Sequence, residues 1–470
     1  MKNLCIPQLI PQEICLKCEN CCRFSEEFSP WSPYILKGER ECFNSQEVLP
    51  FFIKSYGINL KLKKEKDFFV CPFFDLAYKK CSLYALRPFD CALYPFILFY
   101  HQNYSQVLLG IDLQCPYLST LKKEVLFNFA LRIKKIVEEE ILEMIYEHPG
   151  VIMDYQTNFQ PLFPLDKLNR RIFGENSGLS IISLRDKEIF DNFFSKYGGA
   201  FSYAFTYLYA WRDIAYLLWK SVGDVLLVFW KQKEDFFLLL PPLGNFLSGE
   251  VFSYLIQLLG EKIRIKNIRE EERDFFLRKG FTLKPTAGEY LYLSGKMINL
   301  SGKELKKKRG ESNYFRKHYL PEVKDLQAED RGKCLKLYED WAKERCAEKR
   351  SDYYLMLLED NFFAQRRLLL DYAVLNLQGI KVEVGGETVG YSFGYPLNEQ
   401  EFCIFAEITH LKLKGISAFI FQEFSRKLKA YKFINAMDDA GLENLRREKL
   451  SYSPLLVKTI YSAEGNQGVG

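Results

Sequence analysis

Ten of the 13 cysteines precede residue 116, and four of them form the run Cys15-x2-Cys18-x2-Cys21-Cys22. Two thiolates separated by two residues can bind one metal ion, because the turn between them brings both sulfur atoms to the same side. The first ten residues lack the continuous apolar stretch of ~7–15 residues of a secretory signal, so we expect a cytoplasmic protein. In that compartment thiols stay reduced, which favours metal binding or redox chemistry over structural disulfides.

Four more cysteines lie farther along the same region and bring the set to eight, the number that two four-coordinate sites require. Zinc and iron–sulfur clusters both accept four thiolates, whereas calcium and magnesium prefer oxygen. A core of reduced cysteines without metal is the alternative. The predicted metal ligands are Cys15, Cys18, Cys21, Cys22, Cys71, Cys81, Cys91 and Cys115.

Residues 10–120 resemble the YkgJ-type cysteine-cluster family, described as zinc- or iron-chelating proteins. The resemblance rests on the run at 15–23, on Cys71-Pro72-Phe73, and on C-S-x-Y-x-x-R-P-x-x-C at 81–91. It implies a zinc or iron–sulfur centre without deciding between them. Cys5 and Cys42 fall outside the family's pattern and are expected not to be ligands.

The remaining chain has the composition of a globular protein, since 48% of its 470 residues are hydrophobic and 27% are charged. That length allows about three domains at ~100–200 residues each. The net charge of +5 permits contact with tRNA or an anionic membrane without requiring either. No apolar stretch reaches the ~18 residues of a transmembrane helix, so none is expected. The oligomeric state stays open.

The second region alternates strand-like and helix-like runs. Paired strands are predicted at 224–231 and 235–240, a hairpin at 379–384 and 388–395, and strands at 401–408 and 432–436. Helices are predicted at 249–259, 353–376 and 415–431. This pattern recurs twice and indicates an α+β fold with two similar halves. The predicted domains are a cysteine-rich metal-binding module at 1–150 and two mixed-sheet halves with flanking helices at 160–292 and 293–465.

Two segments of the second region carry charged groups suited to chemistry. Residues 303–317 contain seven Lys or Arg against two Glu, a density that can bind phosphates or can belong to a solvated helix face. Residues 435–454 place Asp438-Asp439 after a strand and before a basic helix. Those carboxylates can orient or deprotonate an attacking amine or hydroxyl, or they can cap the helix.

Residues 160–462 resemble the carboxy-terminal domain of the phosphatidylglycerol lysyltransferase family. The resemblance rests on Phe163-Pro164-Leu165, Trp211-Arg212, Pro241-Pro242-Leu243-Gly244, Lys308-Arg309, Asn313, Glu407 and the run from Asn435 to Pro454. It implies a tandem pair of GNAT-type halves and aminoacyl transfer from aminoacyl-tRNA. The family's membrane-spanning region has no counterpart in this sequence, which leaves the acceptor open. The acyl-CoA loop of GNAT enzymes survives only in altered form at 412–417.

Together these patterns predict a cytosolic acyltransferase, most plausibly an aminoacyltransferase with aminoacyl-tRNA or acyl-CoA as donor and an amine or hydroxyl as acceptor. Glu407 or Asp439 is the expected base or positioning group. The alternatives are an iron–sulfur redox or modification enzyme whose GNAT-like halves recognise the substrate, and a non-enzymatic binding protein. The partners considered are tRNA and an anionic lipid surface. The predicted substrate-binding residues are Lys308, Arg309, Asn313 and Arg316 with Asn435, Arg446, Lys449 and Tyr452.

Overall fold

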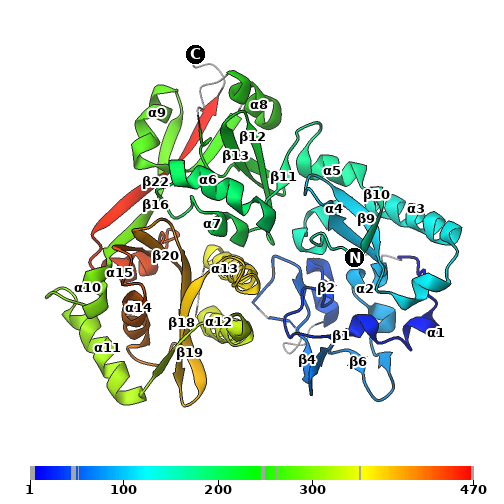
Figure 1. The fold of residues 1–470 in the computed structure, drawn as a ribbon, viewed down its shortest axis with the longest axis horizontal. Coiled ribbons are helices and arrows are strands. Elements are labelled where there is room, and N and C mark those ends of the chain that lie inside the picture. The colour runs from blue at the N-terminus through cyan, green and yellow to red at the C-terminus, as the bar shows by residue number, and fades with distance from the viewer. Residues whose placement is uncertain are drawn as a thin grey trace. The chain divides into compact units, whose positions relative to one another are not determined.

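The computed structural model describes residues 6–43, 49–50, 52–244, 249–260, 262–348 and 351–466. The chain divides into two compact units (Figure 1). The first comprises mainly residues 1–181 and the second mainly residues 182–212, 217–354 and 360–470. The separation of two halves at 160–292 and 293–465 within the second region stays a prediction.

The first unit is built from short strands, turns and a small apolar core. Strands β8 and β9 are buried along their whole length and pair antiparallel, with β10 at the edge of β9. Ile97, Phe99, Leu108 and Phe159 form a core between them. The elements of the cysteine-rich part are α1 (Gln12–Cys15), η1 (Asn20–Cys22), β1 (Arg23–Phe24), β2 (Tyr34–Ile35), η2 (Lys37–Phe43), β3 (Ile58–Asn59), β4 (Lys63–Glu65), β5 (Phe68–Val70), β6 (Phe74–Asp75), β7 (Lys80–Cys81), η3 (Tyr84–Leu86) and α2 (Phe89–Leu93). They are followed by β8 (Phe96–Tyr100), β9 (Val107–Asp112), η4 (Pro116–Thr120), α3 (Lys123–Glu139), α4 (Leu142–Tyr146), η5 (Pro149–Val151), β10 (Phe159–Pro164), α5 (Asp166–Phe173) and β11 (Ser180–Ile181).

Helical periodicity between Leu121 and Glu147 suggests one long helix, but the structure has two. Helix α3 ends at Glu139, and α4 begins at Leu142. The N–H groups of both Glu140 and Ile141 donate to the carbonyl of Ile136, and Ile141 leaves the helical region with φ of −129°. Ile141 remains buried in the new direction, so the apolar spacing continues across the break.

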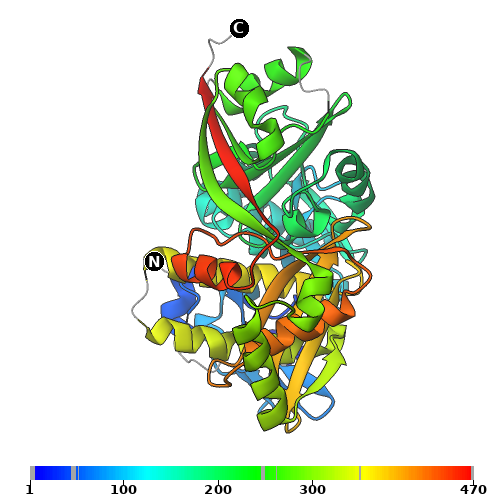
Figure 2. The ribbon, with the colours of Figure 1, turned by 90° about the vertical axis from the view of Figure 1, so that its left-hand side faces the viewer.

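The second unit contains one continuous and mainly antiparallel sheet. Its strands follow in the order β12-β13-β14-β15-β22-β16-β21-β20-β19-β18-β17. The two long strands β16 and β22 pair along most of their length and link both ends of the sheet (Figure 2). The strands of this sheet are β12 (Tyr216–Val222), β13 (Val225–Gln232), β14 (Asp235–Leu238), β15 (Lys262–Arg269), β16 (Thr282–Leu293), β17 (Glu322–Asp325), β18 (Gln378–Val384), β19 (Glu387–Pro396), β20 (Glu401–Thr409), β21 (Phe433–Asn435) and β22 (Leu456–Asn466).

Helices α10, α11 and α14 cover one face of the carboxy-terminal part of this sheet (Figure 1). Helix α14 packs on β19 and β20 and, on its other side, contacts α11 closely because Gly415 precedes it. At φ of +89°, Gly415 sits where an added Cβ would lie 2.2 Å from the Glu311 carbonyl oxygen. The helices are η6 (Leu184–Asp186), α6 (Lys187–Tyr197), α7 (Phe205–Ala210), α8 (Gly249–Leu259), η7 (Glu270–Glu272), α9 (Arg273–Arg278), α10 (Ser294–Asn299), α11 (Lys306–Tyr319), η8 (Ala328–Asp330), α12 (Arg331–Ala347), α13 (Asp352–Leu370), α14 (Ile416–Lys427) and α15 (Glu443–Leu450).

The predicted α+β class is confirmed, and so are the hairpin of β18 and β19, strands β20 and β21, and helices α8 and α14. The sequence interpretation ended the sheet at 432–436 and missed β22, which lies in its middle. Within the described ranges, no helix combines the length and the apolarity needed to cross a bilayer.

Candidate functional sites

Backbone pairing links three of the predicted cysteine ligands. Strand β1 follows the cysteine run and pairs with β5, and the Cys71 N–H donates to the Cys22 carbonyl at 3.0 Å. The next hairpin, β6 with β7, sets Cys81 opposite Phe74. Two short antiparallel pairs therefore bring positions 22, 71 and 81 into one region, although 59 residues separate the first from the last.

The remaining cysteines join the same region. The Asn20 side chain donates to the Gln114 carbonyl at 2.9 Å, which holds the cysteine run next to Cys115. Repulsion from Cys21 contributes to the raised pKa values of six thiols, and repulsion from Cys18 contributes at two of them, Cys15 and Cys115. The six are Cys15, Cys22, Cys71, Cys81, Cys91 and Cys115. Burial is the main cause of these raised thiol pKa values, except at Cys22. A hydrogen bond between the thiols of Cys21 and Cys22 lowers the pKa of the first and raises that of the second.

Eight gathered thiols are donors of the right kind for zinc or an iron–sulfur cluster, because a cation would offset the cost of their charged forms. Among the side chains that the structure describes, however, no three His, Cys, Asp or Glu groups form a ready set of metal ligands. The predicted site thus fits a thiolate-bound metal in residue type and location, while its closure around an ion stays a prediction. Cys5 and the side chain of Cys42 lie outside the described residues.

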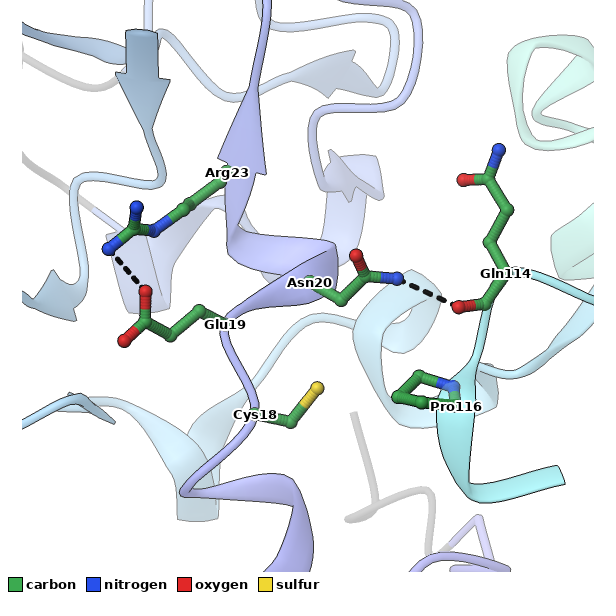
Figure 3. Close-up of a pocket in the computed structure, with 6 residues that line it drawn as sticks. All are labelled: Cys18, Glu19, Asn20, Arg23, Gln114 and Pro116. Carbon is green, nitrogen blue, oxygen red and sulfur yellow. Dashed lines mark hydrogen bonds and ion pairs between the residues drawn. The ribbon is translucent and has the colours of Figure 1, made fainter. Parts of the chain in front are cut away.

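A surface pocket of about 460 Å³ opens beside the cysteine run (Figure 3). The sulfur of Cys18 points toward it between Asn20 and Pro116. Glu19 turns to the other side and pairs with Arg23 and Lys79. A centre held by Cys18 would therefore be accessible from outside on this face.

In the second unit, the parallel strands β20 and β21 pair over only a short stretch. Strands β20 and β21 pair over three residues, from Glu401 with Phe433 to Cys403 with Asn435. Beyond this point β21 ends, whereas β20 continues to Thr409. Glu407 lies on this extension, where β20 pairs with β19 alone, opposite Ser392.

The side chain of Glu407 is partly buried and lies next to the start of α14. Ser417 donates its hydroxyl hydrogen to Glu407 Oε1 at 3.1 Å. The pKa of Glu407 is raised to about 8, mainly by burial and in part by the negative charge of Glu448, while the Ser417 hydrogen bond and the charge of Lys308 oppose this rise. A carboxyl group with a pKa in this range can accept a proton and release it near neutral pH, as a general base must.

Lys308 and Tyr452 flank this carboxyl group. The Lys308 ammonium group is buried, lies 2.6 Å from Glu448 Oε1, and sits 4.4 Å from the centre of the Tyr452 ring. The Tyr452 hydroxyl is buried beside Ser417, yet none of the described residues forms a hydrogen bond of normal geometry with it. The structure thus brings Glu407 and Lys308 next to Tyr452, whose phenol has an unused hydrogen-bond donor.

Asp439 and Asn435 belong to a second group of polar contacts in the same unit. Tyr290 donates its hydroxyl hydrogen to Asp439 Oδ2 at 2.6 Å, and the Gly441 N–H donates to Oδ1 at 3.0 Å. The amide nitrogen of Asn435 donates to Glu289 Oε1 at 2.5 Å and to Glu401 Oε1 at 2.7 Å. Both oxygens of Asp439 are engaged, which suits a positioning group better than a base.

Lys449 fixes the loop that carries these acids. Its ammonium group donates to the carbonyls of Ala436 and Asp438, and burial lowers its pKa to about 8. Tyr292 adds a hydrogen bond from its hydroxyl to the Lys449 carbonyl at 2.8 Å. Since Tyr292 also packs edge-on against Tyr452, the two polar groups form one continuous region.

The other predicted substrate-binding residues are spread over the surface. Asn313 and Arg446 are exposed, and Arg316 pairs with Glu423 at 2.5 Å while covering the Phe419 ring. Arg309 donates to the carbonyls of Leu300 and Gly302. Sequence reasoning missed Tyr290, Ser417 and Glu448. Glu448 lies in the basic helix and Ser417 in the altered acyl-CoA loop at 412–417, so both stand in segments that the sequence singled out, whereas Tyr290 does not.

Tyr290→Phe is expected to destabilise the protein by ~1.5–3 kcal/mol, because it leaves a buried carboxylate of Asp439 without its hydroxyl donor. The measurement is the free energy of unfolding in urea. Tyr461→Phe is the matched control, since its hydroxyl donates to Glu270 Oε2 at 2.7 Å on the surface. We expect its loss to cost below ~0.5 kcal/mol. Equal effects of both substitutions would contradict the importance of burial at Asp439.

Comparisons with known proteins agree with the division of the chain. The family model described as phosphatidylglycerol lysyltransferase, C-terminal, matches residues 197–464, which is more than half of the chain. The CxxCxxCC model, described as a zinc- or iron-chelating domain, matches residues 14–116. No curated protein matches. Both resemblances inferred from the sequence are confirmed.

Solved structures resemble the chain over about three fifths of its length. A conserved protein of unknown function from Bacteroides thetaiotaomicron is 23% identical over 61% of this chain and 99% of its own, with a TM-score of 0.54. L-PGS from Bacillus licheniformis is 17% identical over 60% of this chain and 93% of its own, with a TM-score of 0.45. Because the phosphatidylglycerol lysyltransferase C-terminal family model matches more than half of the chain, the chain belongs to that family, and it joins this domain to a CxxCxxCC domain.

Proposed function

We propose that the chain is an aminoacyltransferase that moves an aminoacyl group from aminoacyl-tRNA to an amine or hydroxyl acceptor. Membership in the lysyltransferase C-terminal family supports this class of reaction. The observation that carries the proposal is the Glu407 group: a carboxyl with a pKa of about 8 lies on β20 beyond its pairing with β21, beside a phenol with a free donor.

In the proposed reaction, the Glu407 carboxylate removes a proton from the acceptor as its nitrogen or oxygen attacks the ester carbonyl. A tetrahedral intermediate forms and then expels the ribose hydroxyl oxygen of the tRNA. That oxygen needs a proton, which the Tyr452 hydroxyl can donate and Glu407 can return to the phenol. The new bond is an amide or ester, the broken bond is the aminoacyl ester, and no oxidant or metal is consumed.

The Asp439 group would serve to orient the acceptor. Tyr290 and Gly441 hold the Asp439 carboxylate, and Lys449 holds the loop before it, so this region is rigid before substrate binds. Asn435 anchors the beginning of the same loop by accepting the Met437 N–H at 2.9 Å. Arg446 is exposed next to this region and is proposed to contact the acceptor.

Donor phosphates are proposed to bind along the exposed side of α11. Lys308 is held by Glu448, so its proposed role is to offset the repulsion between that carboxylate and Glu407. Arg316 and Asn313 face outward and remain candidates for contact with the tRNA backbone, with Arg309 bracing the preceding turn. Binding through these groups should weaken steeply as the salt concentration rises.

The cysteine module is proposed to hold zinc or an iron–sulfur centre. The pocket beside Cys18 supports a second candidate function, a redox or modification reaction at that centre, because a purely structural site would need no opening. Absorbance and metal analysis of protein purified without oxygen separates the two. A colourless protein with zinc would leave the module structural, whereas an iron–sulfur spectrum that changes on reduction would support the second function.

The identity of the donor is tested by comparing two labelled compounds in separate reactions. A labelled aminoacyl-tRNA pool and labelled acetyl-CoA are each incubated with the chain, lipid extract and small amines, and the label in acceptors is followed. The proposal expects label from the tRNA only. Transfer from acetyl-CoA alone would overturn the aminoacyl donor and would retain only an acyltransferase.

A further inference from the structure

A second pocket of about 320 Å³ lies in the second unit, away from the Glu407 group. Its lining comes from the turn at Gly199 and Ala200, from residues 269–271, from Glu289 of β16 and from the start of β22. Side chains alternate along a strand, so Glu289 faces away from Tyr290, which belongs to the core under α14. The pocket therefore opens on the opposite face of the sheet from Glu407.

Glu289 is the deepest charged group in this pocket and is only half satisfied. Its side chain has 0% exposure. Oxygen Oε1 accepts hydrogen bonds from the Phe201 N–H at 2.7 Å and from Asn435 at 2.5 Å. Oxygen Oε2 has no partner among the described residues. A buried carboxylate oxygen without a donor is costly, so its position calls for a ligand that donates hydrogen bonds.

The charged groups around the pocket determine whether a cation or an anion would be favoured as its ligand. Three carboxylates, from Glu270, Glu271 and Glu289, line the pocket against the two cations Arg269 and Lys458. Arg269 is already engaged, since it donates to Glu272 Oε1 at 2.7 Å and to the carbonyls at 197 and 198. The Lys458 ammonium donates to the Gly199 carbonyl at 3.2 Å.

A further carboxylate lies behind this lining. Glu401 shares the Asn435 amide with Glu289, and its Oε2 is 4.0 Å from the Lys458 ammonium. Lys458 therefore faces two buried acids at once and cannot neutralise both. The interior keeps an excess of negative charge and favours a cation.

We infer that this pocket binds a small organic amine in its ammonium form, with the ammonium group donating to Glu289 Oε2. An ammonium group has three donors, of which one can satisfy Oε2 while the others reach the backbone or water. The volume is at the lower end of the ~300–1,000 Å³ typical of ligand sites, which suits a compact molecule. The inference does not depend on acyl transfer, because it concerns binding alone.

Ligand binding at this site would affect the loop that carries Asp439, because hydrogen bonds connect the two. Asn435 bonds to Glu289 on one side and accepts the Met437 N–H on the other, and the Tyr290 N–H donates to the Met437 carbonyl at 3.0 Å. An ammonium group on Glu289 is thus two hydrogen bonds away from the loop at 437–439.

Calorimetric titration of the full chain with 1,4-diaminobutane tests this site, with succinate as the anionic counterpart of similar length. We expect the diamine to bind and succinate not to bind. Glu289→Gln keeps the oxygen that accepts from Phe201 and Asn435 but removes the charge, so the diamine Kd should rise at least about tenfold. Glu401→Gln removes only a charge behind the lining, since Glu401 also bonds to Asn435 but does not line the pocket, so its loss of affinity should be clearly smaller than that of Glu289→Gln.

A second variant leaves Glu289 untouched. Leu456 is exposed at the pocket lining, so Leu456→Arg should be tolerated and should weaken diamine binding through like-charge repulsion. Absence of diamine binding to the parent would overturn the inference. So would preferential binding of succinate, or equal losses in Glu289→Gln and Glu401→Gln. Failure of any acyl transfer assay would leave this result unaffected.

Discussion

Replacing Glu407 with Gln should lower the rate of aminoacyl transfer by about 10²–10⁴, because glutamine keeps the side chain's shape but cannot accept the acceptor's proton. The parent's rate should rise with pH as Glu407 loses its proton around pH 8. The variant should lack this rise. The measurement is the single-turnover rate of transfer between pH 6 and pH 9.5 for both proteins.

Glu423→Gln is the control for this experiment. Glu423 also belongs to the α14 region, but it pairs with Arg316 and Arg426 and lies outside the proposed reaction site. Its loss should change the rate by less than about threefold. If Glu407→Gln keeps the parent's rate and pH profile, Glu407 is not the base.

At high pH, Glu407→Gln should raise the free energy of unfolding, although it lowers the rate of transfer. Burial raises the folded-state pKa of Glu407 to about 8, above its unfolded value of ~4.3, so the folded protein holds this proton more tightly. The stabilising contribution is complete below the unfolded pKa and is lost as pH rises to about 8. At pH 9 the variant should therefore be the more stable protein, which would separate a catalytic role from a structural one.

Replacing Cys71 with Ser should lower the affinity of the first unit for its metal by more than ~100-fold, since losing even outer-shell partners costs 10–100-fold. The thermal stability of the unit should fall as well, because metal binding contributes directly to folding. The measurements are metal content after dialysis against a chelator and the unfolding temperature with and without metal.

Cys346→Ser is the matched control, because Cys346 is a partly buried thiol on α12, far along the sequence from the cluster. It should leave metal content unchanged. Full metal content in Cys71→Ser, or equal loss in both variants, would contradict the predicted ligand set.

Local sequence patterns predicted much of the second unit. The glycine pair at 385–386 indicated the hairpin of β18 and β19, and continuous apolar runs indicated β13 and β20. Strand β22 was missed because Lys458, Thr459, Ser462 and Glu464 interrupt its apolar pattern. Its position depends instead on pairing with β15 and β16, more than 160 residues earlier in the chain.

The site followed the same division between local and distant information. Glu407, Asp439 and the cysteine run stand in recognisable motifs, and so could be named from the sequence. The roles of Tyr290 and Ser417 could not be predicted, although Ser417 ends the loop at 412–417, because each contributes one hydroxyl whose partner is set by the packing of β16 or α14. The sequence of the segment 303–317 also does not distinguish its buried residues from its exposed ones. Only the fold turns Lys308 inward to Glu448 and leaves Asn313 outside.

The most direct test of the central claim is transfer itself. A pool of tRNA charged with labelled amino acids is incubated with the metal-loaded chain and a mixture of lipids, amines and peptides, and the products are identified by mass spectrometry. The account predicts an amino acid joined by an amide or ester bond to one acceptor, formed by the parent and not by Glu407→Gln. Charged tRNA that remains intact with every acceptor, beside a folded and metal-loaded protein, would contradict it.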